Sequence, residues 1–199
     1  MDTHTEASEP LARRRDADPG GEASLIAQIA GGDRRAFETL YRAYLPRLTR
    51  FLHRMTRNVP LIEEIVDDTM LVVWQKASTF DHSCKLSTWV FAIAYRKGCK
   101  VLHRLDEPVD ADMETCEGEA DWRPEWRCEQ ARLAQALDAA LDELPLAQRA
   151  AFQLTFYHDM SYAEIAEILE CPVNTVKTRL FHARRRLALL LADQLEGRP

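Results

Sequence analysis

The chain has 199 residues, of which 46% are hydrophobic and 29% charged, and its formal net charge is −6, so a water-soluble globular protein is expected. No apolar run approaches the length needed to cross a bilayer, and no hydrophobic segment follows the charges near the N-terminus, so we expect a cytoplasmic protein without membrane insertion. The five cysteines form no CxxC pair, which argues against a disulfide framework and against a metal site.

The acidic total conceals strongly basic segments. Residues 34–57 carry seven arginines and one glutamate, residues 94–104 carry four basic residues and no acid, and residues 172–188 carry five Lys/Arg and no acid. Residues 106–129 carry ten acids and two arginines. Local fields decide where a polyanion binds, so the net charge does not exclude nucleic-acid binding.

In chain order, residues 1–23 are predicted to be a disordered tail, because they are rich in charge, proline and glycine. Apolar residues at helical spacing begin near Ser24 and continue to residue 105. The predicted helices are a short one ended by Gly31-Gly32, one with a stripe from Phe37 past Pro46 to Met55, one over 61–76, and one over 87–105 capped by Ser87 or Thr88. No alternating strand pattern of useful length occurs, so the prediction is an all-α fold.

Residues 106–128 interrupt this periodicity and are predicted to be a flexible acidic linker, because they combine acids with Pro108, Gly118 and Pro124. Helical spacing returns over 129–192, and residues 193–199 form a short tail. The sequence therefore predicts two helical domains, 24–105 and 129–192. A fully extended linker of this length spans roughly 70–80 Å, about two turns of duplex DNA.

Residues 160–187 have the pattern of a helix-turn-helix. Apolar residues from Tyr162 to Leu169 give a short first helix, which Pro172 is expected to end, and Asn174 or Thr175 is a candidate N-cap for a basic second helix. A buried stripe is predicted at Val176, Leu180, Ala183 and Leu187. The candidates for contact with a DNA major groove and its flanking phosphates are Thr175, Lys177, Thr178, Arg179, His182, Arg184 and Arg185, with Phe181 and Arg186 beside them.

The helix predicted over 87–105 is aromatic in its first half and basic in its second. Ring faces and cations suit an unstacked single strand better than a duplex, and a core role remains open for each aromatic residue. The candidates for binding an opened strand are Lys85, Ser87, Trp89, Tyr95, Arg96, Lys100 and Arg104.

Three segments in this order resemble the bacterial sigma-70 family of RNA polymerase sigma factors, and within it the extracytoplasmic function (ECF) group. They are EEIVDDTMLVVWQKASTF (63–80), STWVFAIAYRKGCKVLHR (87–104) and the segment from Leu141 to Leu187. The resemblance covers residues 25–190. It implies that residues 24–105 are sigma region 2 and that residues 129–192 are sigma region 4.

The resemblance also implies partners. Region 2 is expected to dock on the clamp helices of the largest subunit of core RNA polymerase and to bind and melt the −10 element of promoter DNA. Region 4 is expected to read the −35 duplex and to bind the flap of the second-largest subunit. An anti-sigma factor is a further expected partner. The residues that match the polymerase-docking helix are Glu64, Asp67, Asp68, Leu71 and Trp74.

The sequence departs from the family pattern at Asp67, where the family often has Gln, at Met70, where it often has Phe, and at Arg96, where Asn is usual. One alternative is a helix-turn-helix regulator that binds operator DNA without the polymerase core. Another is a nuclease, which the absence of HExxH, P-loop or paired ligand spacings disfavours. We therefore expect a protein that has no catalytic residues, cofactor or metal.

Overall fold

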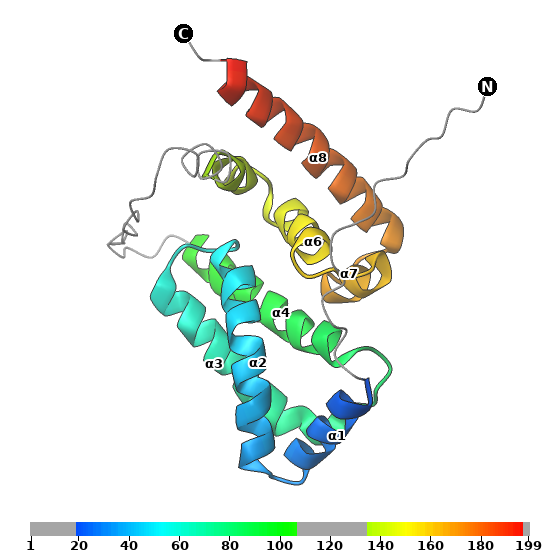
Figure 1. Ribbon diagram of the computed structural model, residues 1–199. Helices are drawn as coiled ribbons and strands as arrows, with labels where there is room; N and C mark the ends of the chain where they lie inside the picture. Colours follow the sequence, from blue (N-terminus) through cyan, green and yellow to red (C-terminus); the bar gives the residue numbers. More distant parts are fainter. Residues whose placement is uncertain (1–18, 107–134, 197–199) are drawn as a thin grey trace, which may run out of the picture.

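The computed structural model describes residues 19–106 and 135–196, and every regular element in these ranges is helical (Figure 1), which confirms the all-α prediction there. The predicted linker lies almost entirely outside the described residues, as does most of the N-terminal tail. The elements with known bounds are α1 (Pro19–Ala30), α2 (Arg34–His53), α3 (Val59–Lys76), the 3₁₀ turn η1 (Ala77–Thr79), α4 (Leu86–Asp106), α6 (Leu146–Phe156), α7 (Tyr162–Ile168) and α8 (Val173–Glu196). A further helical segment reaches residue 142.

The N-terminal module consists of α1 to α4. Asp33 caps α2, because its carboxylate accepts hydrogen bonds from the backbone N–H groups of Arg35 and Ala36, and Asn58 caps α3 in the same way through Leu61 N–H. The apolar stripe of α2 runs without a break past Pro46, as the sequence predicted. α1 begins at Pro19, five residues before the predicted start at Ser24, since proline is tolerated in the first turn of a helix.

The C-terminal module consists of the segment ending at residue 142 and α6, α7 and α8. α8 is the longest helix whose bounds are defined, and α6 and α7 lie along its first half (Figure 1). The core of this module contains the buried side chains of Leu141, Leu154, Ile165, Val176 and Leu180. The predicted stripe of α8 is confirmed, since Val176, Leu180, Ala183 and Leu187 are all buried.

The two modules pack against each other. α4 lies beside α7, and one continuous apolar cluster includes Phe51 and Phe91 from the N-terminal module and Leu154 and Ile165 from the C-terminal module. His158 enters this cluster from the turn after α6, where its ring meets the edges of Phe91 and Phe51 at centroid distances of 4.7 and 6.0 Å. The contact between modules is therefore apolar at its centre.

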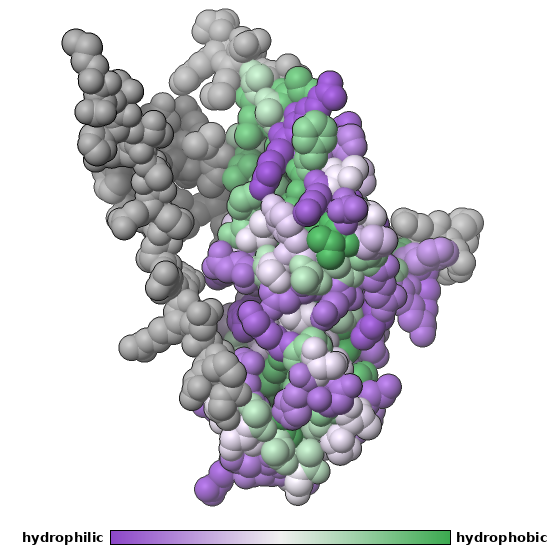
Figure 2. Space-filling model, turned by 90° about the vertical axis from the view of Figure 1, so that its right-hand side faces the viewer, coloured by the Kyte–Doolittle hydropathy of each residue, from purple (hydrophilic) through white to green (hydrophobic). Residues whose placement is uncertain are grey.

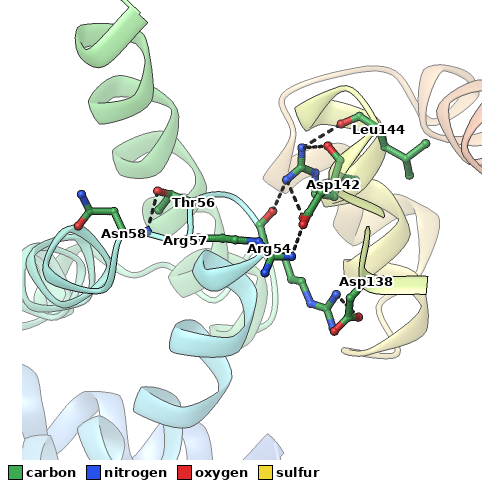
Figure 3. A network of polar contacts seen from close by, with 8 residues as sticks. Arg54, Thr56, Arg57, Asn58, Asp138, Asp142 and Leu144 are labelled. Atoms are coloured by element: carbon green, nitrogen blue, oxygen red, sulfur yellow. Dashed lines mark hydrogen bonds and ion pairs between the residues drawn. The ribbon is translucent and has the colours of Figure 1, made fainter. Parts of the chain in front are cut away.

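Polar contacts join the modules at the end of α2 (Figure 3). Arg149 of α6 donates to the backbone carbonyl of Arg54 at 2.9 Å, and also to the carbonyls of Asp142 and Leu144 at 2.8 and 3.1 Å. Arg54 forms an ion pair with Asp138, and Arg57 forms one with Asp142. Burial lowers the pKa of the Arg149 guanidinium, although the Asp142 carboxylate opposes this effect.

Hydrophilic side chains cover most of the face shown in Figure 2, and the larger apolar areas lie toward its upper end, at the height of the C-terminal half of α8. Within the described ranges, no helix is both long and apolar enough to cross a membrane.

Candidate nucleic-acid interface

The first helix of the helix-turn-helix, α7, begins with a capping box. The Ser161 side chain accepts the backbone N–H of Glu164 at 3.3 Å, and the Glu164 carboxylate accepts the backbone N–H of Ser161 at 2.7 Å. These reciprocal bonds satisfy two backbone donors that a helix start leaves free. They fix where α7 begins and hold Glu164 in one position.

α7 ends earlier than the sequence predicted. Its last turn closes in a Schellman motif, in which the Cys171 N–H donates to the Ala166 carbonyl at 3.0 Å and Glu170 takes a positive φ of 49°. The prediction that Pro172 ends this helix is therefore wrong. Periodicity missed the real stop because glutamate, rather than glycine, holds the left-handed position.

α8 also begins earlier than predicted, at Val173, so neither Asn174 nor Thr175 is its N-cap. The Thr175 N–H donates to the Pro172 carbonyl at 2.8 Å, which places Pro172 before the first turn. Asn174 and Thr175 lie within that turn, and the Thr178 hydroxyl donates to the Asn174 carbonyl at 2.9 Å.

The outer face of α8 carries most of the predicted groove-contacting residues. Lys177, Thr178, His182, Arg184 and Arg185 are exposed, as are Phe181 and Arg186, whereas Thr175 is half-buried. Arg184 lies over the ring of Phe156 at 5.3 Å. Arg179 is half-buried and reaches back to the turn, where its Nη1 lies 3.4 Å from the Cys171 Sγ. α8 therefore presents an exposed cationic face opposite its buried stripe.

Two of the predicted strand-binding residues, Lys85 just before α4 and Arg96 within it, pair with carboxylates of the C-terminal module. Lys85 Nζ is 3.0 Å from Glu164 Oε1, and Arg96 Nη1 is 2.8 Å from Glu170 Oε1. Lys100 and Arg104 are exposed farther along the helix. Partial burial would raise the pKa of the Glu164 carboxyl, but the hydrogen bonds from Ser161, together with the Lys85 ammonium, lower it below its ordinary value.

The aromatic candidates on α4 are half-buried. Trp89 packs beside Phe80 at a centroid distance of 5.0 Å, and Phe80 packs against His82 at 4.8 Å, so the loop before α4 presents a small aromatic cluster. Burial, together with the Cys99 thiol, raises the pKa of the Tyr95 hydroxyl.

The predicted cap of α4 is wrong. The helix begins at Leu86, which is buried, so the half-buried Ser87 and the buried Thr88 both lie within its first turn. The apolar contacts of Leu86 extend the helix beyond the hydroxyl residues that suggested a cap.

The predicted docking residues share one face of α3. Glu64, Asp67, Asp68 and Leu71 are exposed there, and 51% of the Leu71 surface is accessible. Asp67 accepts the Tyr41 hydroxyl at 3.0 Å, and Asp68 accepts Lys97 Nζ at 2.6 Å. Trp74 is half-buried, edge-on to Phe37. The exposed part of this face is acidic with an apolar side chain at its centre.

Sequence reasoning missed the residues that join the modules. They include Arg149, His158, Glu164 and Glu170. The S-x-x-E spacing of Ser161 and Glu164 is a recognisable capping signal and could have located Glu164. No comparable pattern marks the other three, because their roles arise from contacts between distant segments.

Within residues 19–106 and 135–196, no group of three or more His, Cys, Asp or Glu could hold a metal ion. Cys84, Cys99 and Cys171 are free and half-buried there. The other two cysteines, Cys116 and Cys128, lie outside the described residues.

Two family models match this chain. The model of sigma-70 region 2 matches residues 40–104, and the model of sigma-70 region 4 matches residues 134–187. The matches fall on α2 to α4 and on the C-terminal module. These are the two parts that carry the cationic α4 and α8 helices.

Characterised proteins are similar over most of the chain. The ECF RNA polymerase sigma factor RpoE of Cereibacter sphaeroides is 31% identical over 162 residues, which cover 78% of this chain and 86% of the relative. The ECF RNA polymerase sigma factor SigM of Mycobacterium tuberculosis is 32% identical over 170 residues, which cover 85% of this chain and 84% of the relative.

Two solved structures are also similar, each with a TM-score of 0.63. CnrH, solved with the cytosolic domain of CnrY, is 27% identical and covers 86% of this chain and 97% of its own. The sigma factor RpoE from Bartonella quintana, solved with the anti-sigma factor NepR, is 25% identical and covers 78% of this chain and 96% of its own. The chain therefore belongs to the sigma-70 family as an ECF sigma factor, a non-catalytic RNA polymerase subunit that directs promoter-specific transcription initiation.

Proposed function

We propose that α8 reads the −35 duplex of the promoter. The observation that carries this assignment is the cationic outer face of α8, on which Lys177, Thr178, His182 and Arg185 are exposed opposite a fully buried stripe. A recognition helix needs such a face, because its outer side chains contact base edges while its inner side chains hold it on the domain. Thr175, Arg179 and Arg184 complete the proposed contact set, and Arg179 would have to leave Cys171 to reach DNA.

The proposed role of α4 is to bind the opened −10 strand through Lys85, Ser87, Trp89, Tyr95, Arg96, Lys100 and Arg104. The aromatic cluster of Phe80, His82 and Trp89 supports this role, since ring faces at the start of the helix could hold an unstacked base. The cations farther along α4 could follow the phosphates of the same strand.

The proposed docking surface for the polymerase is the face of α3 that carries Glu64, Asp67, Asp68, Leu71 and Trp74. An acidic surface around an exposed leucine suits a basic partner with an apolar pocket, such as the clamp helices of the largest subunit. We propose that the C-terminal module contacts the flap of the second-largest subunit. In this proposal, residues 106–128 are a flexible acidic tether that lets the modules occupy two promoter elements.

The proposal also includes an anti-sigma factor as a partner and a cytoplasmic location. Two similar chains were solved as complexes, CnrH with the cytosolic domain of CnrY and RpoE with the anti-sigma factor NepR. These partners belong to those proteins, and we propose only a partner of the same class for this chain.

The test of the assignments is transcription by purified core polymerase on a library of promoters, with and without the full chain. We expect initiation from a small set of sequences that share two elements one spacer apart, and binding to operator DNA in the absence of polymerase should be weak. A chain that binds DNA tightly as a dimer and leaves initiation unchanged would contradict the proposal.

Docking is tested with Glu64→Arg, which reverses one exposed charge on α3. We expect lost copurification with core polymerase and an unchanged helical circular dichroism spectrum. Glu38→Arg is the matched control, since Glu38 is an exposed residue of α2 and its ion pair with Arg42 lies within one helix. Equal copurification of the two variants would remove the docking assignment.

A further inference from the structure

The C-terminal end of α2 carries four basic side chains that the functions proposed above do not use. Arg50 and His53 belong to the last turn of the helix, Arg54 follows it directly, and Arg57 lies in the turn before α3. Arg50, His53 and Arg57 are exposed, whereas Arg54 is half-buried. This end of α2 therefore offers several cationic groups to solvent within a short stretch of chain.

The four side chains line one cavity. Its volume is about 420 Å³, which is within the roughly 300–1,000 Å³ range of sites for small molecules. Two residues of the C-terminal module complete the wall, and the full lining is Arg50, His53, Arg54, Arg57, Asp138 and Tyr157. Four basic groups thus share the wall with a single carboxylate.

The positive charge of this cavity is only partly neutralised. Arg54 pairs with Asp138 and Arg57 pairs with Asp142, and the Asp142 carboxylate is shared with Arg149 (Figure 3). The other two basic side chains of the wall form no ion pair with any residue of 19–106 or 135–196. An anion in the cavity would therefore meet cations that lack a partner of opposite charge in these ranges.

The groups around the cavity are also held in place and carry a positive field. The Arg54 guanidinium lies over the Tyr157 ring at 5.7 Å and pairs with Asp138, yet its five N–H donors leave some for a ligand. Burial lowers the pKa of the neighbouring His158, and the charges of Arg47 and Arg50 lower it further. The cationic field of this end of α2 is thus felt inside the contact between the modules.

We propose that this cavity binds a small anion with two or more linked phosphate groups, such as inorganic pyrophosphate or a nucleoside triphosphate. Arginine side chains bind phosphate oxygens through paired N–H donors, and linked phosphates can reach several of these side chains at once. A nucleic-acid strand would instead need a groove that continues along its backbone, whereas residues of both modules enclose this cavity. The site is separate from the proposed promoter and polymerase surfaces.

The test is calorimetric titration of the full chain with inorganic pyrophosphate, with ATP and with inorganic phosphate, in magnesium-free buffer. The variant is Arg50→Gln with His53→Gln, which leaves the ion pairs of Arg54 and Arg57 intact. Hydrogen exchange of the α4 amides, which lie beside α7, reports whether each variant keeps the closed form, in which the two modules pack together.

The matched control is Arg34→Gln with Arg35→Gln. These two exposed arginines lie at the other end of α2, about 24 Å from Arg50 at roughly 1.5 Å per residue. The control removes at least as much positive charge as the variant, and the backbone N–H that caps the helix remains.

We expect the parent chain to bind pyrophosphate and ATP about tenfold more tightly than phosphate, since a single phosphate reaches fewer cations. The variant should bind both about tenfold more weakly than the control, with unchanged α4 exchange. Equal affinity of the parent for pyrophosphate and ATP would identify the linked phosphates alone as the recognised group. Tighter binding of ATP would identify a nucleotide.

Three results would overturn the proposal. The first is no measurable binding of pyrophosphate or ATP by the parent, and the second is equal affinity of the variant and the control. The third is a variant that loses affinity for a labelled single strand of mixed sequence but not for pyrophosphate, because the cavity would then serve a nucleic-acid backbone. None of these results bears on the docking of α3 to polymerase, which copurification measures separately.

Discussion

The two cationic helices of this chain, α4 and α8, differ in what covers them. On α8, Lys177 and Arg185 are exposed and form no ion pair with another residue of the described ranges. At α4, Lys85, which directly precedes the helix, and Arg96 are paired with carboxylates of the other module. A basic helical face in the sequence therefore does not by itself determine whether that face is available to DNA.

The origin of the difference is the charge of the neighbouring helix. α7 places carboxylates at its start and just beyond its end, and α4 packs beside it. The part of α8 from 173 to 188 contains no acid, and its outer face meets no other described helix that would supply one. Substitutions in the core of the C-terminal module, at the contact between modules and on the outer face of α8 are therefore expected to differ in the size of their effects.

Leu180→Ala should change stability the most, because it removes apolar packing that holds α8 on its module. Leu180 is fully buried in the core of the C-terminal module, so Leu180→Ala should lower the free energy of unfolding by about 2–5 kcal/mol through lost burial and a residual cavity. Chemical denaturation measures the loss, and −35 duplex binding should fall with it. A free energy of unfolding within 1 kcal/mol of the parent would mean that α8 does not depend on this core.

The next effect concerns the pH dependence of the closed form. Burial between Phe51 and Phe91, with Arg47 and Arg50 nearby, lowers the pKa of His158 to about 4. When the modules separate or unfold, His158 regains an ordinary pKa near 6.5, so the open chain binds more protons between these values. The stabilisation is therefore complete above about pH 6.5 and is lost as the pH falls toward 4, with an upper limit of about 3 kcal/mol.

This dependence is measured by urea denaturation of the parent and of His158→Leu between pH 7 and pH 5. The parent should lose more stability over this interval than the variant, because leucine binds no proton. Equal slopes of stability against pH would show that His158 does not titrate at a lower pH in the closed form.

A smaller effect is expected at the outer face of α8. Arg185→Ala should weaken −35 duplex binding by about 1–3 kcal/mol if the side chain contacts a base edge, and should lower the slope of log affinity against log salt by roughly one if it contacts a phosphate. The control is Arg42→Ala, an exposed arginine of α2 whose ion-pair partner Glu38 lies in the same helix. Equal affinity and equal slope in both variants would exclude α8 as the duplex reader.

The smallest effect provides a reference for the ion pairs that cross between modules. Glu38→Ala removes an exposed pair within α2 and should change the free energy of unfolding by roughly 0.3–0.5 kcal/mol, with no change in α4 exchange. A larger change, or faster exchange in α4, would mean that surface charge alters closure without a direct contact.

Periodicity predicted the parts of the fold that depend on neighbours in the sequence. The stripe of α8, the continuous stripe of α2 past Pro46 and the absence of strands in the described ranges all follow from apolar spacing. The errors fall at helix ends. Leu86 extends α4 through tertiary burial, and Glu170 ends α7 in a conformation that favours glycine, so local propensity could not locate either boundary.

The candidate site was predictable to a similar extent. Lys177, Thr178 and Arg185 are exposed because they lie opposite a strong apolar stripe, and the stripe is visible in the sequence. The pairing of Arg96 with Glu170 was not predictable, since 74 positions separate the two residues. Likewise, no local pattern tells that His158 will enter the core of the other module.

At Glu170, the stability of the helix-turn-helix and the contact between the modules favour different residues. Replacing this residue by glycine would relax the backbone and should make the helix-turn-helix more resistant to heat, yet the same change would release Arg96. A library screened for thermal stability alone would select such a variant, which lacks the ion pair between Arg96 and residue 170. For this protein, the thermal stability of the helix-turn-helix and the packing of the two modules against each other should therefore be measured separately.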